Sequence, residues 1–336
     1  MRSLKFLSGL AGAFLLGIGT ATAADPVKIR LAWVVPVSNW GTMLMEKLDL
    51  ARNNGKTYQL EAVRYQGTPP MITALAAGEL EIALLAYPTL GIAIQNAGMK
   101  DLRVIADEIQ DGAPNYYTHE FFVLKDSPVK SVSDLKGKVV ATNAAGSAVD
   151  IAMRAILRKN KLDDKKDVTV IETAFPNMKA MLAEKKVDLV PAVLPFSMDP
   201  ALRSMARTLF TERDALGTNE LAFWAAREGF IKKNRAALVD LTEDAMRIIR
   251  WYIDPANHKA AVEIAAKVTK QPPENFDFWL FTKGKDYYRD RNMLPNLEAL
   301  QSNLNVVHQL GFIKAPINVK QYADLSIVQE AAKRVK

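Results

Sequence analysis

KVVATNAAGSAVDIAMRAIL, residues 138–157, is the stretch that decides the fold. Its β-branched residues Val139 and Val140 predict a strand. A loop of small residues follows, and Ser147 then stands where a helix begins. Ser147 can accept hydrogen bonds from free backbone N–H groups, and Asp150 three residues later completes a Ser-x-x-Asp capping box. The stretch therefore predicts a strand, a tight loop and a helix start.

This helix start has two interpretations. Its unpaired N–H donors and the positive end of its dipole can seat a small anion or a polar head group. An ordinary turn between a strand and a well-capped helix has the same pattern, and the pattern alone favours this simpler interpretation. Asp150 also argues against an anion seat, because a carboxylate in the first helical turn competes for the same dipole.

The first 24 residues have the pattern of a cleavable secretory signal. Arg2 and Lys5 precede an apolar run over residues 7–19, and small residues follow, so we expect cleavage after Ala23 or Ala24. The apolar run is too short for a membrane span, and no later segment is long and apolar enough to be one. We therefore expect a soluble, exported protein.

Composition excludes several classes of function. The sequence contains no cysteine, which excludes a lipid anchor on cysteine, a thiolate metal site, disulfides and a cysteine nucleophile. Beyond the signal the chain has 42 basic and 37 acidic residues, a net charge of +5. These charges are dispersed and form no basic stripe interleaved with aromatics, so we expect no nucleic-acid partner. A modest positive field suits an anionic solute better than a cation.

Strand and helix patterns alternate along the first two hundred residues. Strands are predicted at 27–35, 58–65, 81–86, 102–105, 138–141, 168–171 and 187–193, and helices at 42–51, 69–78, 147–160 and 177–184. Such alternation is typical of parallel, doubly wound sheets with helices on both faces. The order of elements repeats between residues 69–86 and 175–194, each ending in an apolar strand and a proline. Two similar α/β lobes are therefore predicted.

Two segments, 115–123 and 217–226, are predicted to cross between these lobes as a pair of hinges. A chain that crosses twice returns its C-terminal part to the first lobe. We therefore expect residues 25–117 and 220–336 in lobe I and residues 118–219 in lobe II. The C-terminal part is predicted to be mainly helical, at 236–251, 258–270 and 296–310.

Motifs for catalysis are missing from the sequence. It contains neither a Gly-x-Ser-x-Gly nucleophile elbow nor a P-loop. The three histidines, His119, His258 and His308, are far apart in the sequence and predict no metal site. His119 lies at the first crossing, where it is interpreted as a hinge hydrogen-bonding group, with ligand contact as the alternative.

Loops that follow the predicted strands offer a place for a ligand, because open α/β sheets bind ligands at the carboxyl ends of their strands. These loops carry small residues and single aromatics at Trp40, Tyr65, Tyr87, Phe175 and Phe196. Aromatic walls with helix N-termini suit a small organic anion or zwitterion, although each aromatic taken alone is explained equally simply by core packing. Arg64, near a strand end, is either a counter-charge or an exposed arginine without a ligand role.

Three stretches carry a resemblance to a known family. They are ITALAAGELEIALLAYP at 72–88, DSPVKSVSDLKGKVVATNAAGSA at 126–148, and LQSNLNVVHQLGFIKAPINV at 300–319. With them the chain resembles the periplasmic substrate-binding proteins of ABC importers for aliphatic sulfonates, taurine and nitrate, which are related to thiamine-pyrimidine binding proteins. The loop TNAAGS lacks the basic residue that some members carry.

The resemblance implies a type II periplasmic-binding-protein fold, whose two lobes close on a solute. It also implies a monomer in the periplasm that delivers the solute to a permease with its ATPase. By position it implies ligand contacts from Asn39, Trp40, Gly67, Thr68, Tyr87, Asn143, Gly146, Ser147, Phe175, Phe196 and Asn219.

The resulting expectation is a binding protein, with neither enzymatic activity nor a cofactor, that captures a small sulfonated or carboxylated organic compound. Nitrate or a pyrimidine is an alternative ligand. A sensory domain on the same fold is a further alternative. An enzyme on this fold, such as the related pyrimidine synthases, is disfavoured because those enzymes depend on a cysteine-containing motif.

Overall fold

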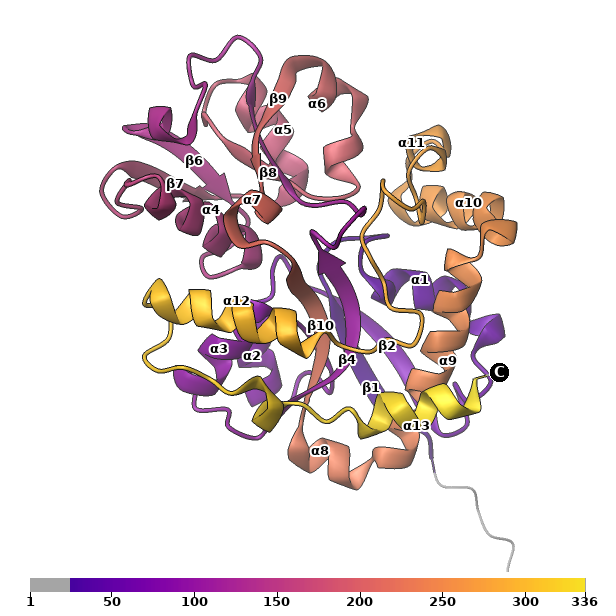
Figure 1. Cartoon of the computed structure of the whole chain (residues 1–336). Helices are drawn as coiled ribbons and strands as arrows, with labels where there is room; N and C mark the ends of the chain where they lie inside the picture. Colours follow the sequence, from indigo (N-terminus) through magenta and orange to yellow (C-terminus); the bar gives the residue numbers. More distant parts are fainter. Residues whose placement is uncertain (1–24, 336) are drawn as a thin grey trace, which may run out of the picture.

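The computed structural model describes residues 25–335, so the predicted signal at 1–24 lies outside the described residues. Strands and helices alternate in two parts of the chain, and helices dominate its C-terminal part (Figure 1). The strands are β1 Val27–Trp33, β2 Tyr58–Arg64, β3 Ala83–Ala86, β4 Leu102–Asp111, β5 Glu120–Leu124, β6 Lys138–Thr142, β7 Val168–Glu172, β8 Val190–Ala192, β9 Ala206–Thr211 and β10 Asn219–Arg227.

The helices begin and end as follows: α1 Trp40–Glu46, α2 Pro70–Ala76, α3 Tyr87–Gln95, α4 Ala148–Lys159, α5 Phe175–Ala183, α6 Pro200–Met205, α7 Glu212–Leu216, α8 Glu228–Lys233, α9 Arg235–Ile253, α10 His258–Thr269, α11 Glu274–Asp277, α12 Leu297–Gln309 and α13 Ser326–Arg334. Within residues 25–335, none of them combines the length and apolar character needed to cross a membrane.

The first sheet has the strand order β2-β1-β3-β10-β4. β1 and β2 pair in parallel from Val27 opposite Tyr58 to Trp33 opposite Arg64. A bridge between Leu31 and Ile82 continues the sheet to β3. β10 then lies between β3 and β4 and is antiparallel to both. We call the part of the chain built on this sheet lobe I.

The second sheet repeats this plan in the order β7-β6-β8-β5-β9. β6 and β7 pair in parallel from Lys138 opposite Val168. A bridge between Val140 and Leu189 continues the sheet toward β8, and β5 lies antiparallel between β8 and β9. Figure 1 shows this part, lobe II, above lobe I. The predicted pair of similar α/β lobes is therefore confirmed, whereas the residue boundaries given above for the lobes stay a prediction.

The expectation of purely parallel sheets is wrong in both lobes. In lobe I, β4 leads out toward lobe II and β10 returns from it, so the two strands must run in opposite directions where they are neighbours. The predicted crossing at 217–226 is wrong for the same reason, because residues 219–227 form β10 inside the first sheet. β4 is also longer than predicted and continues to Asp111.

Buried carboxyl groups lie on the two lobe I strands that precede and follow the connections to lobe II. Asp107 on β4 and Glu220 on β10 are both buried and share a side-chain hydrogen bond. Each has one buried oxygen atom without a hydrogen-bond partner, and a proton shared between the two carboxyl groups would satisfy both oxygens. Their other oxygens accept hydrogen bonds from the backbone N–H groups of Asp290 (3.2 Å) and Asn296 (2.9 Å). The pair thus fastens the C-terminal segment to β4 and β10.

Burial raises the pKa of Asp107 to about 7 and the pKa of Glu220 well above its ordinary value. The folded protein therefore keeps protons that the unfolded chain releases near pH 4. Because each raised pKa favours the folded state only while the group is protonated, the free energy of unfolding falls as pH rises from about 4 through these raised values.

We predict that Glu220→Gln makes the free energy of unfolding fall less between pH 5 and pH 8 than it does in the wild type. Glutamine keeps both contacts, donating to Asp107 and accepting from the Asn296 N–H, without releasing a proton. The substitution removes the contribution of Glu220 to this fall, which is at most about 1.4 kcal/mol per pH unit for one titrating group. Urea unfolding at several pH values measures it, with Glu79→Gln at an exposed position as the control. An unchanged pH dependence in Glu220→Gln would contradict the shared proton.

Candidate functional site

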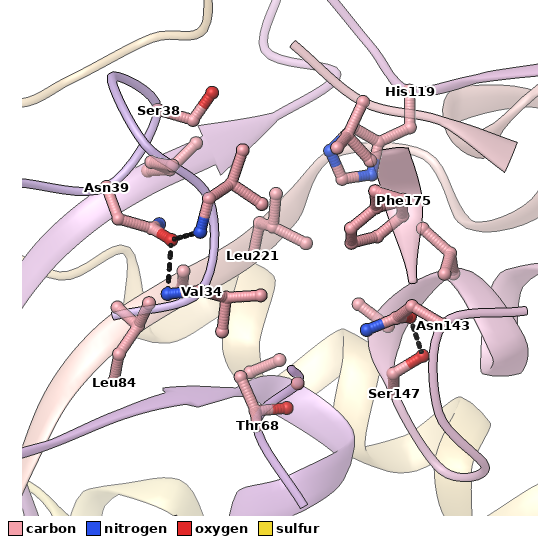
Figure 2. A pocket seen from close by; sticks show the side chains of 18 of the residues that line it. Val34, Ser38, Asn39, Thr68, Leu84, His119, Asn143, Ser147, Phe175 and Leu221 are labelled. Carbon is pink, nitrogen blue, oxygen red and sulfur yellow. Dashed lines mark hydrogen bonds between the residues drawn. The ribbon is translucent and has the colours of Figure 1, made fainter. Parts of the chain in front are cut away.

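A small cavity lies between the two lobes, where the strands of both sheets end. Its volume is about 80 Å³. Lobe I and its C-terminal segment contribute Val34, Val35, Ser38, Asn39, Gly67, Thr68, Leu84, Ala86, Ile109, Leu221, Ala222 and Tyr287, and the remaining wall consists of His119, Asn143, Ser147, Ala148, Val149, Phe175, Val193 and Leu194. Figure 2 shows these side chains converging from both sides. We call this space the inner cavity.

The first turn of α4 forms one wall of the inner cavity. Ser147 caps the helix, as predicted, by accepting the Asp150 N–H at 3.4 Å, and its hydroxyl donates to Asn143 Oδ1 at 2.7 Å. The Asp150 carboxylate accepts the Gly146 N–H at 2.8 Å instead of the expected Ser147 N–H. The N–H groups of Ala148 and Val149 have no acceptor among the described residues. They are thus hydrogen-bond donors on the cavity wall.

The negative charge of Asp150 is compensated by a neighbouring arginine. Arg154 lies one turn further along α4, and its Nε is 3.0 Å from a carboxylate oxygen of Asp150. Burial raises the pKa of Asp150, and the Arg154 guanidinium opposes this rise. The ion pair lies behind the helix start, so neither residue lines the inner cavity.

Thr68 faces this helix from lobe I. Thr68 is 8% exposed, and its hydroxyl oxygen is buried without a hydrogen-bond partner in the described part of the chain. Figure 2 shows the hydroxyl directed toward the side where Asn143 and Ser147 lie. A buried hydroxyl without a partner is unfavourable, which makes Thr68 a donor available to a bound molecule.

Close approach of the two lobes favours glycine at position 67. A Cβ atom built on Gly67 would lie 3.0 Å from Asn143 Nδ2 and 3.2 Å from the Ala144 Cβ. Beside it, the side chains of Gln66 and Asn143 donate to each other's backbone carbonyl groups, at 3.3 and 3.4 Å. The Ser38 hydroxyl makes a further contact across the cavity with the Leu194 carbonyl, at 2.6 Å.

His119 lines the inner cavity and belongs to a buried polar network. Its Nδ1 lies 2.7 Å from a Glu212 oxygen and its Nε2 lies 2.8 Å from the Tyr287 hydroxyl, which also accepts the Leu194 N–H at 3.1 Å. Asp111 accepts the backbone N–H of His119 at 2.7 Å. His119 is therefore a hydrogen-bonding group at the first crossing, as predicted, and its part in a hinge stays a prediction.

Burial alone would lower the pKa of His119, but the charges of Asp111 and Glu212 together raise it. Burial raises the pKa of Asp111 to about 7. Asp111, His119 and Glu212 could also be considered as metal ligands, since their ligand atoms lie within 4.8 Å of one another. However, 2.7 Å between Nδ1 and the Glu212 oxygen fits a proton between them and is too short for two ligands of one ion. Because Glu212 and Asp111 both contact His119, this residue is not an isolated positive charge in the cavity.

Six residues implied by the resemblance line the inner cavity together: Asn39, Gly67, Thr68, Asn143, Ser147 and Phe175. Their contact with a ligand stays a prediction. Asn39 also has a structural role, because its Oδ1 accepts the backbone N–H groups of Val34 (3.0 Å) and Val35 (2.7 Å). Phe196 lies beside Phe175 and lines a second, outer cavity of about 280 Å³.

The other four implied residues lie behind the cavity wall. Trp40 is buried in the lobe I core, stacked on Phe281 with ring centroids 5.7 Å apart. The Tyr87 hydroxyl lies 3.2 Å from the Ala148 carbonyl oxygen, within the contact between the lobes. Asn219 is bound to Asn303 at 2.7 Å, and Gly146 adopts a positive φ in the loop before α4. None of the four lines the inner cavity, and their contact with a ligand stays a prediction.

Several lining residues were not expected from the sequence. Leu84, Ile109 and Leu221 are ordinary apolar residues of β3, β4 and β10, and each faces the cavity only because β10 inserts between the other two strands. Tyr287 lies in a segment without regular structure, far along the chain. No local pattern could have indicated them.

The inner cavity has no charged side chain apart from an ionised His119, because no lysine, arginine, aspartate or glutamate of residues 25–335 lines it. A helix N-terminus stabilises an anion by about 0.3 to 1 kcal/mol, and by up to about 2 kcal/mol when partly buried. Removing an ion from water costs several kcal/mol. The helix start therefore offers too little for a fully buried anionic head and suits an uncharged hydrogen-bond acceptor.

Comparison with known proteins assigns this chain to a family. Residues 22–266 match the NMT1-like family. Among solved structures, the alkanesulfonate-binding protein SsuA from Xanthomonas axonopodis pv. citri, bound to MOPS, superposes with a TM-score of 0.70 at 18% identity, over 90% of this chain and 100% of that chain. The nitrate-binding protein NrtA from Synechocystis PCC 6803 superposes with a TM-score of 0.72 at 14% identity, over 94% and 90%.

The fold also occurs in an enzyme. The desulfurization enzyme DszB superposes with a TM-score of 0.63 at 16% identity, over 92% of this chain and 99% of that chain. At such identities the structural likeness concerns the fold, whereas the family match covers most of the sequence. The chain therefore belongs to the NMT1-like family and has the type II fold of periplasmic binding proteins.

Proposed function

We propose that this protein is the solute-binding component of an ABC importer and captures a small organic anion between its two lobes. The observation that carries the proposal is the inner cavity itself, which is walled by both lobes and contains unused hydrogen-bond donors at Ala148, Val149 and Thr68. In this proposal the protein acts in the periplasm as a monomer and delivers the solute to a permease with its ATPase.

The contacts across the cavity support capture by closure. Ser38 and Leu194, Gln66 and Asn143, and Tyr287 and Leu194 are joined by hydrogen bonds between the lobes. Each such bond is worth about 1 kcal/mol net, so a few of them can bias a hinge without locking it. A solute that touches both walls would add to this bias and stabilise the closed form.

The polar groups of the cavity support binding more than catalysis. Both ring nitrogens of His119 are occupied by Glu212 and Tyr287, so this ring would have to give up a partner to act as a base. The Ser147 hydroxyl donates to Asn143 and has no histidine beside it. A ligand would therefore meet donors that hold it, without an activated nucleophile.

We predict that a solute of the proposed class raises the melting temperature of the purified protein. A ligand at a hundredfold excess over its Kd stabilises the folded state by about 2.7 kcal/mol, which corresponds to several degrees for a protein of this size. The measurement is a thermal-shift screen with alkanesulfonates, nitrate, aliphatic and aromatic carboxylates, and pyrimidines. The absence of a shift with every one of these solutes would contradict the proposal.

A second prediction concerns Ser147. Leucine at this position would project into a cavity of only about 80 Å³, so Ser147→Leu should abolish binding of the solute found in the screen. The matched control is Ser147→Ala, which loses the helix cap at a cost of roughly 1 kcal/mol in stability but leaves the cavity open. Calorimetric titration measures binding, and circular dichroism checks that both variants are folded. Unchanged affinity in Ser147→Leu would place the ligand elsewhere.

A further inference from the structure

A second cavity adjoins the inner one on its solvent side. This outer cavity of about 280 Å³ shares Val34, Val35 and Phe175 with the inner cavity. Its wall is completed by Pro36, Arg64, Tyr65, Gln66, Ala174, Pro176 and Phe196. The Phe175 ring stacks on Phe196 with centroids 6.3 Å apart and lines both spaces. The two cavities are therefore neighbouring compartments with Phe175 between them.

Arg64 is the one lysine, arginine, aspartate or glutamate among the described residues that line these two compartments, and unlike His119 it has no carboxyl group beside it. It is the last residue of β2, and its guanidinium carbon lies 5.6 Å from the centroid of the Trp33 ring. No acidic partner binds it among the described residues, whereas Arg30 on the adjacent strand β1 is paired with Glu81 at 2.6 Å. Arg64 is thus a positioned cation whose hydrogen-bond donors are available.

We propose that Arg64 binds the anionic head of the solute in the outer cavity and that the uncharged end of the solute enters the inner cavity. This inference rests on the proposed function and assigns an orientation and a ligand class to that site. The planar guanidinium can pair with two oxygens of a carboxylate or sulfonate, and the partly solvated outer cavity spares the ion complete burial.

The inner cavity defines the other end of the molecule. Its volume of about 80 Å³ is well below the roughly 150 Å³ of an apolar cavity that holds benzene, so it accommodates only a few non-hydrogen atoms. The wall is mostly apolar, with the Ala148 and Val149 N–H groups and the Thr68 hydroxyl as donors. The ligand class is therefore a short organic monoanion with an uncharged hydrogen-bond acceptor, such as a ketone or ether oxygen, remote from its charge.

Calorimetric titration of the purified protein tests this orientation with four probes: pentanoate, 4-oxopentanoate, butane-1-sulfonate and pentanamide. Arg64→Gln should weaken binding of the anionic probes by about tenfold to a hundredfold, because a charge-assisted pair is lost. Arg52→Gln is the matched control, since Arg52 is exposed in the same lobe and lines neither cavity. Thr68→Val should lower the affinity for 4-oxopentanoate severalfold and leave the affinity for pentanoate unchanged.

The outcomes separate this inference from the proposed function. Anion binding that is lost in Arg64→Gln but kept in Arg52→Gln supports it, and the carboxylate and sulfonate arms then distinguish the two head groups. Anion binding that is equal in Arg64→Gln and wild type overturns the orientation while the proposed function stands. Binding of pentanamide without binding of any anion overturns the ligand class. Failure of the wild type to bind these probes or any solute of the thermal-shift screen counts against the proposed function itself.

Discussion

The pairing of β4 with β10 is the constraint on which the rest of the structure depends. These neighbouring strands connect lobe I to the two crossings, one outward and one returning, and must therefore be antiparallel. Their pairing brings the apolar side chains of Ile109 and Leu221 to the inner cavity. It also places Asp107 and Glu220 where both accept backbone N–H groups of the C-terminal segment. Part of the cavity wall and the two connections to lobe II thus depend on the same pair of strands.

The distribution of charge around the cleft bears on the proposed binding of an anion. Acidic groups near the cavity are compensated locally, Asp150 by Arg154 and Glu212 by His119. The inner cavity is left with neutral donors, and the exposed Arg64 lies in the outer compartment. A helix dipole contributes too little to replace a counter-ion in a closed space. In the proposal, the separation of the neutral donors from the cation therefore sets the orientation of the ligand.

Local patterns in the sequence predicted much of the fold. The run from Val139 to Ser147 forms the predicted strand, loop and capped helix start, because these features depend on neighbours in the chain. The antiparallel strand β10 was mistaken for a crossing, because its direction depends on pairing with β3 and β4, which lie more than a hundred residues away. The direction of β10 is therefore a long-range feature that no local pattern could indicate.

The residues of the candidate site were likewise predictable only in part. Phe175, which was expected in a loop after a strand, lines the inner cavity, since strand ends meet at one edge of a sheet. Thr68 and Asn143, which the resemblance implied, line it as well. Trp40 and Tyr87 stand in equivalent loops but turn into the packing between elements. Tyr287 reaches the cavity from an irregular segment, and only the tertiary structure brings it there. Which side of a loop faces the ligand is decided by packing.

The central claim, closure of two lobes on a solute, is tested most directly by a distance measured across the cleft. Because the sequence contains no cysteine, single cysteines can be introduced at the exposed positions Glu184 in lobe II and Gln271 in lobe I and labelled with nitroxides. Pulsed electron paramagnetic resonance then gives the distance between the labels with and without the best-binding solute. The account predicts a shorter and narrower distance distribution when the solute is present. An identical distribution in both conditions, with binding verified in the labelled protein, would contradict it.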